Sequence, residues 1–310
     1  MSEFYSKQKI WEEIIRFFPE NNRIGNDCSP SETILAWENG YIHLDQYKNP
    51  KAPAKIIMLH GVGGNGRILS FMAVPLFKKG FEVMCPDLPG YGFTSTSSRN
   101  ITFQGWIDAV NHLIETETDD DKRPVFLFGF SLGGTLAYHV AAQNKGIKGI
   151  IATCLLDQRF RKVRDFSAIN KTMSRWGPLF LKAFNTISPS LMLPMKLVAN
   201  TGGIVNNPDL LKILLQDKTS SGVSVPIRFL HSIINAKPDL EPENFQHCPI
   251  ALFHPEKDKW TPVELSKMFF DRIKGNKELK ILENAGHFPL EKPGILQLEK
   301  YTEDFIKKYL

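Results

Sequence analysis

Residues 124–138 read Pro-Val-Phe-Leu-Phe-Gly-Phe-Ser-Leu-Gly-Gly-Thr-Leu-Ala-Tyr, and this stretch decides the fold. An apolar run enters the Gly-x-Ser-x-Gly pattern at 129–133, and an alanine-rich segment leaves it. A strand, a sharp turn and a helix in that order hold a serine with its hydroxyl exposed at the top of the turn. Gly129 and Gly133 keep side chains out of the crowded turn. The stretch therefore predicts that Ser131 is a nucleophile, and the alternative is a serine that only caps a helix.

The chain around this unit alternates short apolar runs with longer amphipathic segments. Such alternation builds βαβ units, so it predicts an α/β fold with a mostly parallel central sheet flanked by helices. A hairpin of Thr33–Trp37 with Tyr41–Tyr47 is expected before it. The expected buried strands are Lys55–His60, Phe81–Cys85, Pro124–Phe128 and Ile147–Leu156, and further strands are expected at Pro249–Phe253 and Glu278–Glu283. The expected helices are Arg67–Lys79, Thr102–Thr116, Leu132–Gln143, Glu264–Ile273 and Ile295–Leu310.

The alternation lapses between Gln158 and Asn244, where the spacing is helical and prolines break the segments. A helical block inside a parallel sheet is expected to be an insertion over the strand ends, where α/β proteins bind ligands. The predicted division is an N-terminal amphipathic helix (3–18) with its lead-in at 1–32, a first core part at 33–157, a helical cap at 158–244 and a second core part at 245–310. The sequence leaves open whether the N-terminal helix packs on the sheet, covers the cap or makes a dimer contact, and it leaves the oligomeric state open.

The charge of the chain is concentrated in the cap. The 310 residues carry 38 Lys and Arg against 33 Asp and Glu, and this modest excess of +5 gives no reason to expect nucleic-acid binding. Residues 158–244 hold twelve basic and six acidic side chains, so the cap has a net charge of +6 and the remainder −1. Because Phe and Trp interleave with these cations, one interpretation is peripheral contact with an anionic membrane surface, and the other is a solvated helix face.

Other features narrow the class of protein. No stretch approaches the roughly 18 uninterrupted apolar residues of a membrane-spanning helix, and the start shows no secretory signal. The four cysteines are scattered, lack the paired spacing of a metal site and are expected to be buried free thiols. Together these features predict a cytoplasmic protein.

A serine nucleophile needs a histidine base, which a carboxylate orients. In a strand–turn–helix architecture the expected chain order is Ser, acid, His. Asp258 follows the expected strand Pro249–Phe253, and His287 follows Glu278–Glu283, so both lie at strand ends. Asp157 also follows a strand and is the alternative acid, although it fits better at the pocket mouth or as a helix cap.

The oxyanion of the reaction needs two backbone N–H donors. We expect one from Leu132, directly after the nucleophile, and the other from Val62 in the glycine-rich loop His60-Gly-Val-Gly-Gly64. The competing interpretation of that loop is a phosphate cradle, but no Gly-Lys-Ser/Thr follows it. His60 is expected to hydrogen-bond within the loop. No metal or organic cofactor is expected.

These motifs, with Pro86-Asp-Leu-Pro-Gly-Tyr-Gly and Gly286-His-Phe-Pro, resemble the α/β-hydrolase superfamily, and most closely its esterase, lysophospholipase and monoacylglycerol-lipase-like members. The resemblance covers about residues 33–157 and 245–310. It implies a two-step acyl transfer by Ser131, His287 and Asp258. Relatives that cleave carbon–halogen bonds or epoxides carry an aspartate at the place of Ser131, so those activities are not expected.

The expected function is hydrolysis of a small-molecule carboxylic ester with a lipophilic acyl group. The alternatives are a thioesterase, amidase or aminopeptidase with the same triad, and a ligand receptor on the same scaffold. The expected substrate-binding residues are Gly61, Phe130, Asp157, Phe160, Trp176 and Phe180, although the aromatic residues of the cap can equally serve only to pack it on the core.

Overall fold

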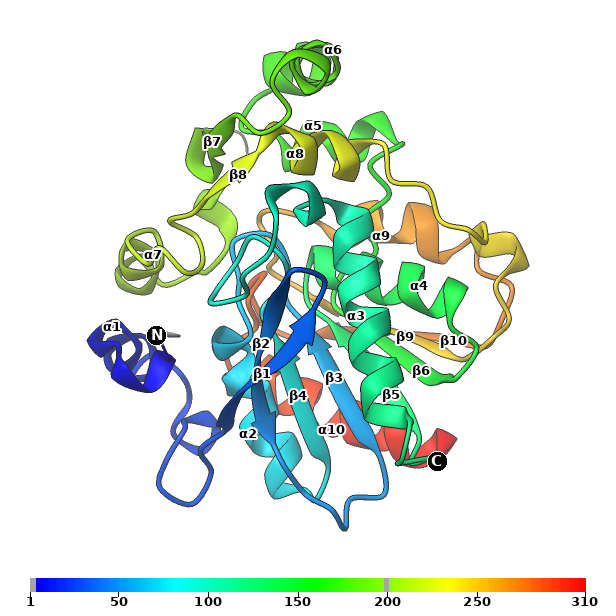
Figure 1. The fold of residues 1–310 in the computed structure, drawn as a ribbon. Coiled ribbons are helices and arrows are strands. Elements are labelled where there is room, and N and C mark those ends of the chain that lie inside the picture. The colour runs from blue at the N-terminus through cyan, green and yellow to red at the C-terminus, as the bar shows by residue number, and fades with distance from the viewer. Residues whose placement is uncertain (1–3, 198–200) are drawn as a thin grey trace.

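A single sheet of eight strands forms the centre of the molecule in the computed structural model, which describes residues 4–197 and 201–310 (Figure 1). The strand order is β1-β2-β4-β3-β5-β6-β9-β10. Strands β1 and β2 form the expected antiparallel hairpin, β2 pairs antiparallel with β4, and the remaining pairs are parallel. The strands are β1 (Ser31–Trp37), β2 (Gly40–Tyr47), β3 (Lys55–Leu59), β4 (Glu82–Pro86), β5 (Val125–Gly129), β6 (Ile147–Ala152), β9 (Ile250–Pro255) and β10 (Lys277–Leu282). The predicted α/β architecture is confirmed.

Helices cover both faces of this sheet and bury one apolar core on each (Figure 1). One face carries α3 (Phe103–Thr118), α4 (Leu132–Gln143) and α9 (Val263–Phe270). The other face carries α2 (Ser70–Lys78) and α10 (Gly294–Tyr309). The central strands β3, β4 and β5 are buried along their whole length, which explains why they read as continuous apolar runs rather than as alternating ones. No helix of the described residues is long and apolar enough to cross a membrane.

The expected cap segment lies together at one end of the molecule (Figure 1). Its helices are α5 (Arg161–Ser167), α6 (Lys171–Ile187), α7 (Pro208–Leu214) and α8 (Ile227–Ile234). It also contains an antiparallel ladder of β7 (Met192–Pro194) with β8 (Ser224–Pro226), which helical spacing did not predict. Leu193 and Val225 precede prolines, and a following proline pushes a residue toward extended backbone.

The N-terminal segment packs onto the rest of the chain. Its regular helix α1 (Lys9–Ile15) is shorter than the predicted 3–18, follows a 3₁₀ turn at Tyr5–Lys7, and residue 3 lies outside the described residues. Helix α1 contacts α7, and Trp11 and Ile14 are buried in the same apolar core as the side chains of α2. The Tyr5 hydroxyl donates to Asp87, directly after β4. The segment therefore joins the cap to the core.

We predict that Trp11→Ala lowers the free energy of unfolding by about 3–5 kcal/mol, because it empties a site that is only 2% exposed. Trp176→Ala is the matched control, since Trp176 is 66% exposed and its removal should change stability by no more than about 0.5 kcal/mol. Chemical denaturation of both variants measures the difference. Equal effects would mean that the N-terminal segment does not contribute to the folded core.

Candidate active site

Ser131 occupies a strained turn between β5 and α4. Its backbone has φ 53° and ψ −127°, a combination that costs on the order of 1–3 kcal/mol for a residue with a side chain. Two contacts hold the turn: the Phe130 N–H donates to the carbonyl of Leu59 (2.9 Å), and the Ser131 N–H donates to Thr153 Oγ1 (3.0 Å). A Cβ at Gly133 would overlap the Leu59 carbonyl oxygen, so the first turn of α4 can approach β3 only with glycine at that position.

His287 and Asp258 meet beyond the ends of β10 and β9. The Nδ1 atom of His287 lies 2.7 Å from Asp258 Oδ2. Asp258 also accepts from the backbone N–H groups of Trp260 (2.9 Å) and Thr261 (2.7 Å) and from Thr261 Oγ1 (2.8 Å). Burial acts to raise the pKa of Asp258, but His287, the Thr261 N–H and His254 outweigh burial and hold the pKa below its usual value. An ionised Asp258 on Nδ1 leaves Nε2 of His287 available as a base.

Asp157 lies in a different ionic network. Its carboxylate accepts from the backbone N–H, Nε and Nη2 of Arg159 at 2.7–3.0 Å, and Arg159 in turn pairs with Glu241. The Nη1 atom of Arg272 lies 3.9 Å from Asp157 Oδ2. The structure thus brings Asp258, and not Asp157, into contact with His287.

The loop after β3 places a second backbone group beside Ser131. A Cβ on Gly61 would lie 2.8 Å from Ser131 Cβ and 3.1 Å from the Leu132 nitrogen. The Gly61 carbonyl accepts from His60 Nδ1 (2.8 Å) and from the Gly64 N–H (3.1 Å). The Gly61 carbonyl and the Val62 N–H belong to the same peptide group, and the C=O and N–H of a trans peptide point in opposite directions. The Val62 N–H is therefore directed away from His60 Nδ1 and the Gly64 N–H. Within residues 4–197 and 201–310, neither the Val62 nor the Leu132 N–H has an acceptor, as an oxyanion hole requires.

His60 holds the Gly61–Val62 peptide in place through a hydrogen bond to the Gly61 carbonyl. Its Nε2 accepts from the Leu88 N–H (3.0 Å) while Nδ1 donates to Gly61, so the ring is neutral. Burial lowers the pKa of His60 to about 4, which keeps the ring neutral at physiological pH. The expected hydrogen-bonding role of His60 in the loop agrees with these contacts.

A turn of the cap also holds the loop after β3. We call residues 217–222 the cap turn. The Ser221 hydroxyl donates to the Gly63 carbonyl (2.8 Å), and Asn65 Nδ2 donates to Thr219 Oγ1 (3.0 Å). The Asp217 carboxylate in turn accepts from the Thr219 and Ser220 hydroxyls. Sequence reasoning did not single out these residues, because nothing in their spacing indicates a partner 150 residues away.

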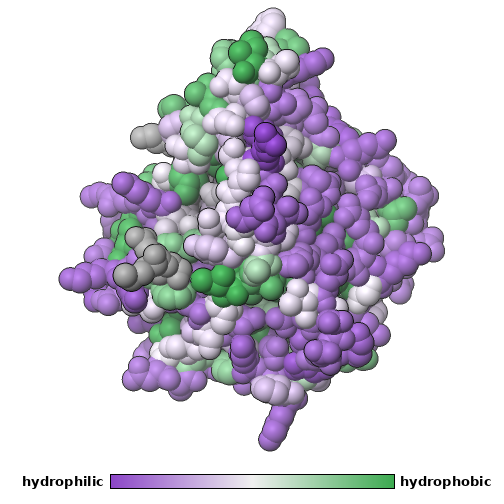
Figure 2. Space-filling model, in the orientation of Figure 1, coloured by the Kyte–Doolittle hydropathy of each residue, from purple (hydrophilic) through white to green (hydrophobic). Residues whose placement is uncertain are grey.

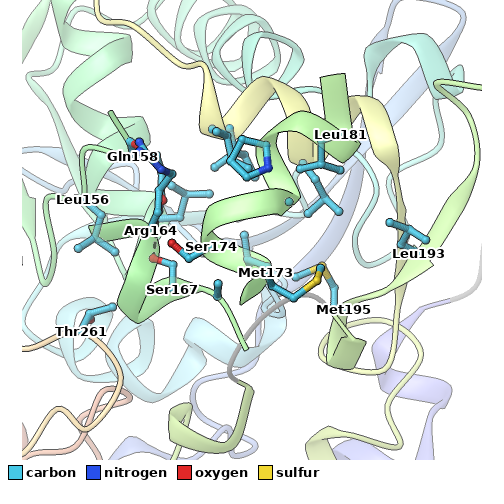
Figure 3. Close-up of a pocket in the computed structure, with 18 of the residues that line it drawn as sticks. Leu156, Gln158, Arg164, Ser167, Met173, Ser174, Leu181, Leu193, Met195 and Thr261 are labelled. Carbon is cyan, nitrogen blue, oxygen red and sulfur yellow. Dashed lines mark hydrogen bonds between the residues drawn. The ribbon is translucent and has the colours of Figure 1, made fainter. Parts of the chain in front are cut away.

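Ser131 opens into an apolar cavity of about 160 Å³ between core and cap (Figure 3). From the core it is lined by Val62, Ser131, Leu132, Leu156, Trp260 and Thr261. From the cap its apolar lining includes Met173, Phe180, Leu181, Leu193, Met195, Leu230 and Ile233.

Only one of the three cap aromatics expected in the site lines this cavity, and that residue is Phe180. The prediction for Trp176 is wrong because α6 turns Met173, Gly177 and Leu181 inward and leaves Trp176 on its outer side. Phe160 instead packs against the small cluster around Leu156 and lies under the Arg272 guanidinium.

The other expected binding residues also lie outside the cavity lining. Phe130 points to the opposite face of the sheet, where it stacks on Phe128. Asp157 lines a small neighbouring hollow. Gly61 lies against Ser131 and serves the site through its backbone.

Among residues 4–197 and 201–310, two groups of side chains have donor atoms close enough together to bind a metal ion, but each group already has protein partners. Cys154, His254 and Asp258 lie within 4.8 Å of one another, yet Thr261 links them, because its hydroxyl contacts Cys154 (3.3 Å) and Asp258 while its carbonyl lies 2.9 Å from His254 Nε2. In the second group, Glu32, His43 and Asp45, both carboxylates pair with Arg67. Thr261 was also missed from sequence, although it directly follows the segment that supplies Asp258.

The comparisons with known proteins agree with this geometry. Residues 50–293 match the family described as serine aminopeptidase, S33, a family of α/β-hydrolases. The chain belongs to this family. Membership confirms the resemblance drawn from the motifs and makes the protein a serine hydrolase.

Relatives of this hydrolase include two enzymes from Bacillus species. It is 24% identical to a thermostable monoacylglycerol lipase of Bacillus sp., over 82% of this chain and 91% of that protein. It is also 24% identical to phospholipase YtpA of Bacillus subtilis, over 85% of this chain and 99% of that protein. The crystal structure of a soluble variant of monoglyceride lipase from Saccharomyces cerevisiae, in complex with a substrate analogue, superposes with a TM-score of 0.73 at 17% identity, over 94% of this chain and 98% of that one.

We predict that Asp258→Asn lowers kcat by about 10⁴-fold, because the amide cannot hold the histidine tautomer that the reaction needs. Asp157→Asn is the matched control and should change kcat by less than about threefold, since Asp157 faces Arg159 and not His287. Hydrolysis of a p-nitrophenyl ester by both purified variants measures kcat. A large loss in Asp157→Asn with a small one in Asp258→Asn would assign the acid to Asp157.

Proposed function

We propose that this hydrolase cleaves carboxylic esters with a lipophilic acyl group through an acyl-enzyme on Ser131. The observation that carries the proposal is the strained Ser131 in the lining of an apolar cavity, together with the His287–Asp258 pair, whose hydrogen-bond partner Thr261 lines the same cavity. Relatives named as a monoacylglycerol lipase and a phospholipase support it, since both names denote the cleavage of lipid esters. The buried free cysteines support a location in the cytoplasm.

The proposed mechanism gives each of these groups one role. His287 takes the proton of Ser131 as the hydroxyl attacks the ester carbonyl, and Asp258 stabilises the imidazolium that forms. The Leu132 and Val62 N–H groups bind the negative charge that develops on the carbonyl oxygen. The imidazolium then protonates the departing alcohol, and water attacks the acyl-enzyme by the same route to release the acid.

We predict that a fluorophosphonate probe labels the wild-type protein and that Ser131→Ala abolishes both labelling and turnover of p-nitrophenyl esters, by at least about 10³-fold. Thermal unfolding of the variant should stay close to that of the wild type, because the change removes one half-buried hydroxyl. Probe fluorescence in a gel and release of p-nitrophenol are the measurements.

The same assay separates the alternatives. Faster cleavage of a p-nitroanilide than of the ester with the same acyl group would favour an amidase or aminopeptidase. Absence of labelling together with absence of turnover would reject the hydrolytic mechanism and favour a receptor.

We also propose that the cap contacts anionic membranes through the outer side of α6. Its exposed apolar side chains include Trp176, Leu179 and Ile187, and its cations are Lys171, Arg175 and Lys182. No acidic residue interrupts the helix from Lys171 to Ile187. Helix α6 forms the outer end of the molecule in Figure 1, and apolar side chains gather at that end in Figure 2. An apolar and basic helix surface of this kind suits the headgroup layer of an anionic bilayer.

We predict that vesicles containing phosphatidylserine bind the protein and that Arg175→Glu/Lys182→Glu weakens binding at least tenfold, because each cation near an anionic surface contributes about 1 kcal/mol. Lys307→Glu/Lys308→Glu is the control with the same change in charge, placed on exposed residues of α10. Co-sedimentation measures binding. Equal weakening by the two pairs would indicate a net-charge effect and contradict a role for α6.

A further inference from the structure

The cavity above Ser131 has two chemically different ends (Figure 3). One end carries Gln158, Arg164, Ser167 and Ser174, and the other carries Leu181, Leu193 and Met195. The polar end comes from the start of the cap and from α5 and α6, while the apolar end comes from α6, β7 and the turn that follows β7. A cavity built only for an acyl chain does not need a cation, so the polar end calls for a separate explanation.

Arg164 is the only cation that lines this cavity among the described residues. Its Nη1 donates to the carbonyls of Gln158 (2.6 Å) and Arg159 (2.9 Å), which fixes the guanidinium in place. Its Nε is buried and has no acceptor within the described parts of the chain, and no bond engages Nη2 there. These two donors form the edge of a guanidinium that binds carboxylate or phosphate oxygens in a bidentate manner.

No acidic side chain compensates the charge of Arg164 in the region that the structure describes. Nearby carboxylates are already engaged: Asp157 and Glu241 bind Arg159, and Asp165 accepts from Ser174. Arg164 also borders an open hollow on the outside of the cap, whose other cations are Arg159, Arg161, Arg175 and Lys237 and whose described lining contains no acid. Of these cations, Arg159 is paired with Asp157 and Glu241, and Arg161 Nε lies 3.9 Å from Asp165 Oδ2. Arg164, Arg175 and Lys237 form no ion pair in the described parts of the chain, so the polar end of the cavity borders an excess of positive charge, which favours an anionic ligand.

The polar end lies on the side from which the alcohol departs. His287 must protonate the leaving group, so the alcohol lies on the histidine side of Ser131. Thr261, which contacts both His287 and Asp258, lines the cavity on the side of Ser167 and Gln158 and away from Leu193 (Figure 3). The acyl chain then occupies the opposite, apolar end.

We propose that Arg164 is a specificity-determining residue that binds an anionic group on the alcohol of the substrate. The substrate class is an ester of a lipophilic acid with an alcohol that carries a phosphate or a carboxylate. This inference rests on the proposed ester hydrolysis at Ser131 and adds which alcohols the site selects.

The test compares a monoacylglycerol with the monoacylglycerol 3-phosphate of the same acyl chain, both below their micelle concentrations so that membrane binding does not contribute. We expect the wild type to show a kcat/KM at least tenfold higher for the phosphorylated ester. Arg164→Met should remove this preference by lowering kcat/KM for the phosphorylated ester at least tenfold while changing that for the neutral ester less than threefold. Arg164→Lys should retain part of the preference, because lysine keeps the positive charge but lacks the planar pair of N–H donors that binds two oxygens at once.

Arg161→Met is the matched control, since Arg161 borders the outer hollow but not the cavity, and it should keep the preference of the wild type. An acyl lactate serves as a carboxylate ester and separates a phosphate site from a general anion site. Equal kcat/KM for charged and neutral esters in the wild type, or an unchanged preference in a folded Arg164→Met, overturns the proposal.

Calorimetric binding of both esters to Ser131→Ala tests the same subsite without turnover, by comparison with the double variant Ser131→Ala/Arg164→Met. If no ester is hydrolysed, the proposed function fails, and tighter binding of the phosphorylated ester that depends on Arg164 still supports the subsite. Equal affinity for the two esters contradicts it.

Discussion

The close approach of three backbone segments around Ser131 sets the geometry of the whole site. Strand β5 ends beside β3, and the first turn of α4 passes so near the Leu59 carbonyl that position 133 has no room for a side chain. This crowding forces Ser131 to φ 53°, lifts its side chain out of the turn and leaves the Leu132 N–H without an intrahelical partner. The proposed nucleophile Ser131 and the proposed oxyanion donor Leu132 therefore result from a single packing constraint, and the strain is offset by the buried core on both faces of the sheet.

The other groups of the site come from distant parts of the chain and depend on the parallel sheet to bring them together. Asp258 and His287 follow β9 and β10, which pair in parallel, so their loops emerge at the same edge. Thr261 then links the acid, the histidine and the strand beneath them through its hydroxyl and carbonyl. The Val62 donor depends in the same way on His60, whose neutral ring connects the loop after β3 to the loop after β4.

The parts of this molecule that sequence could predict are those set by local pattern. Continuous apolar runs indicated the buried strands, and the Gly-x-Ser-x-Gly turn indicated Ser131, because both effects act within a few residues. The sequence did not predict which side chains of the cap face the pocket, because tertiary packing decides their orientation. Helical spacing alone cannot say which side of α6 faces inward, so Trp176 was expected in the pocket and lies outside it. Arg164 was counted only among the twelve basic side chains of the cap, and it lines the pocket. The ladder of β7 with β8 was missed since each strand has only three residues.

The cap turn at 217–222 gives the two halves of the cap different freedom to change. Ser221 and Thr219 hydrogen-bond to the loop that carries Val62, so a substitution near them reaches the chemical step itself. Helices α5 and α6 shape the cavity and the outer surface through side chains that are remote from those bonds. Evolution, or a protein engineer, can therefore change which esters are accepted by altering α5 and α6, while the tethered turn keeps the loop after β3 in place.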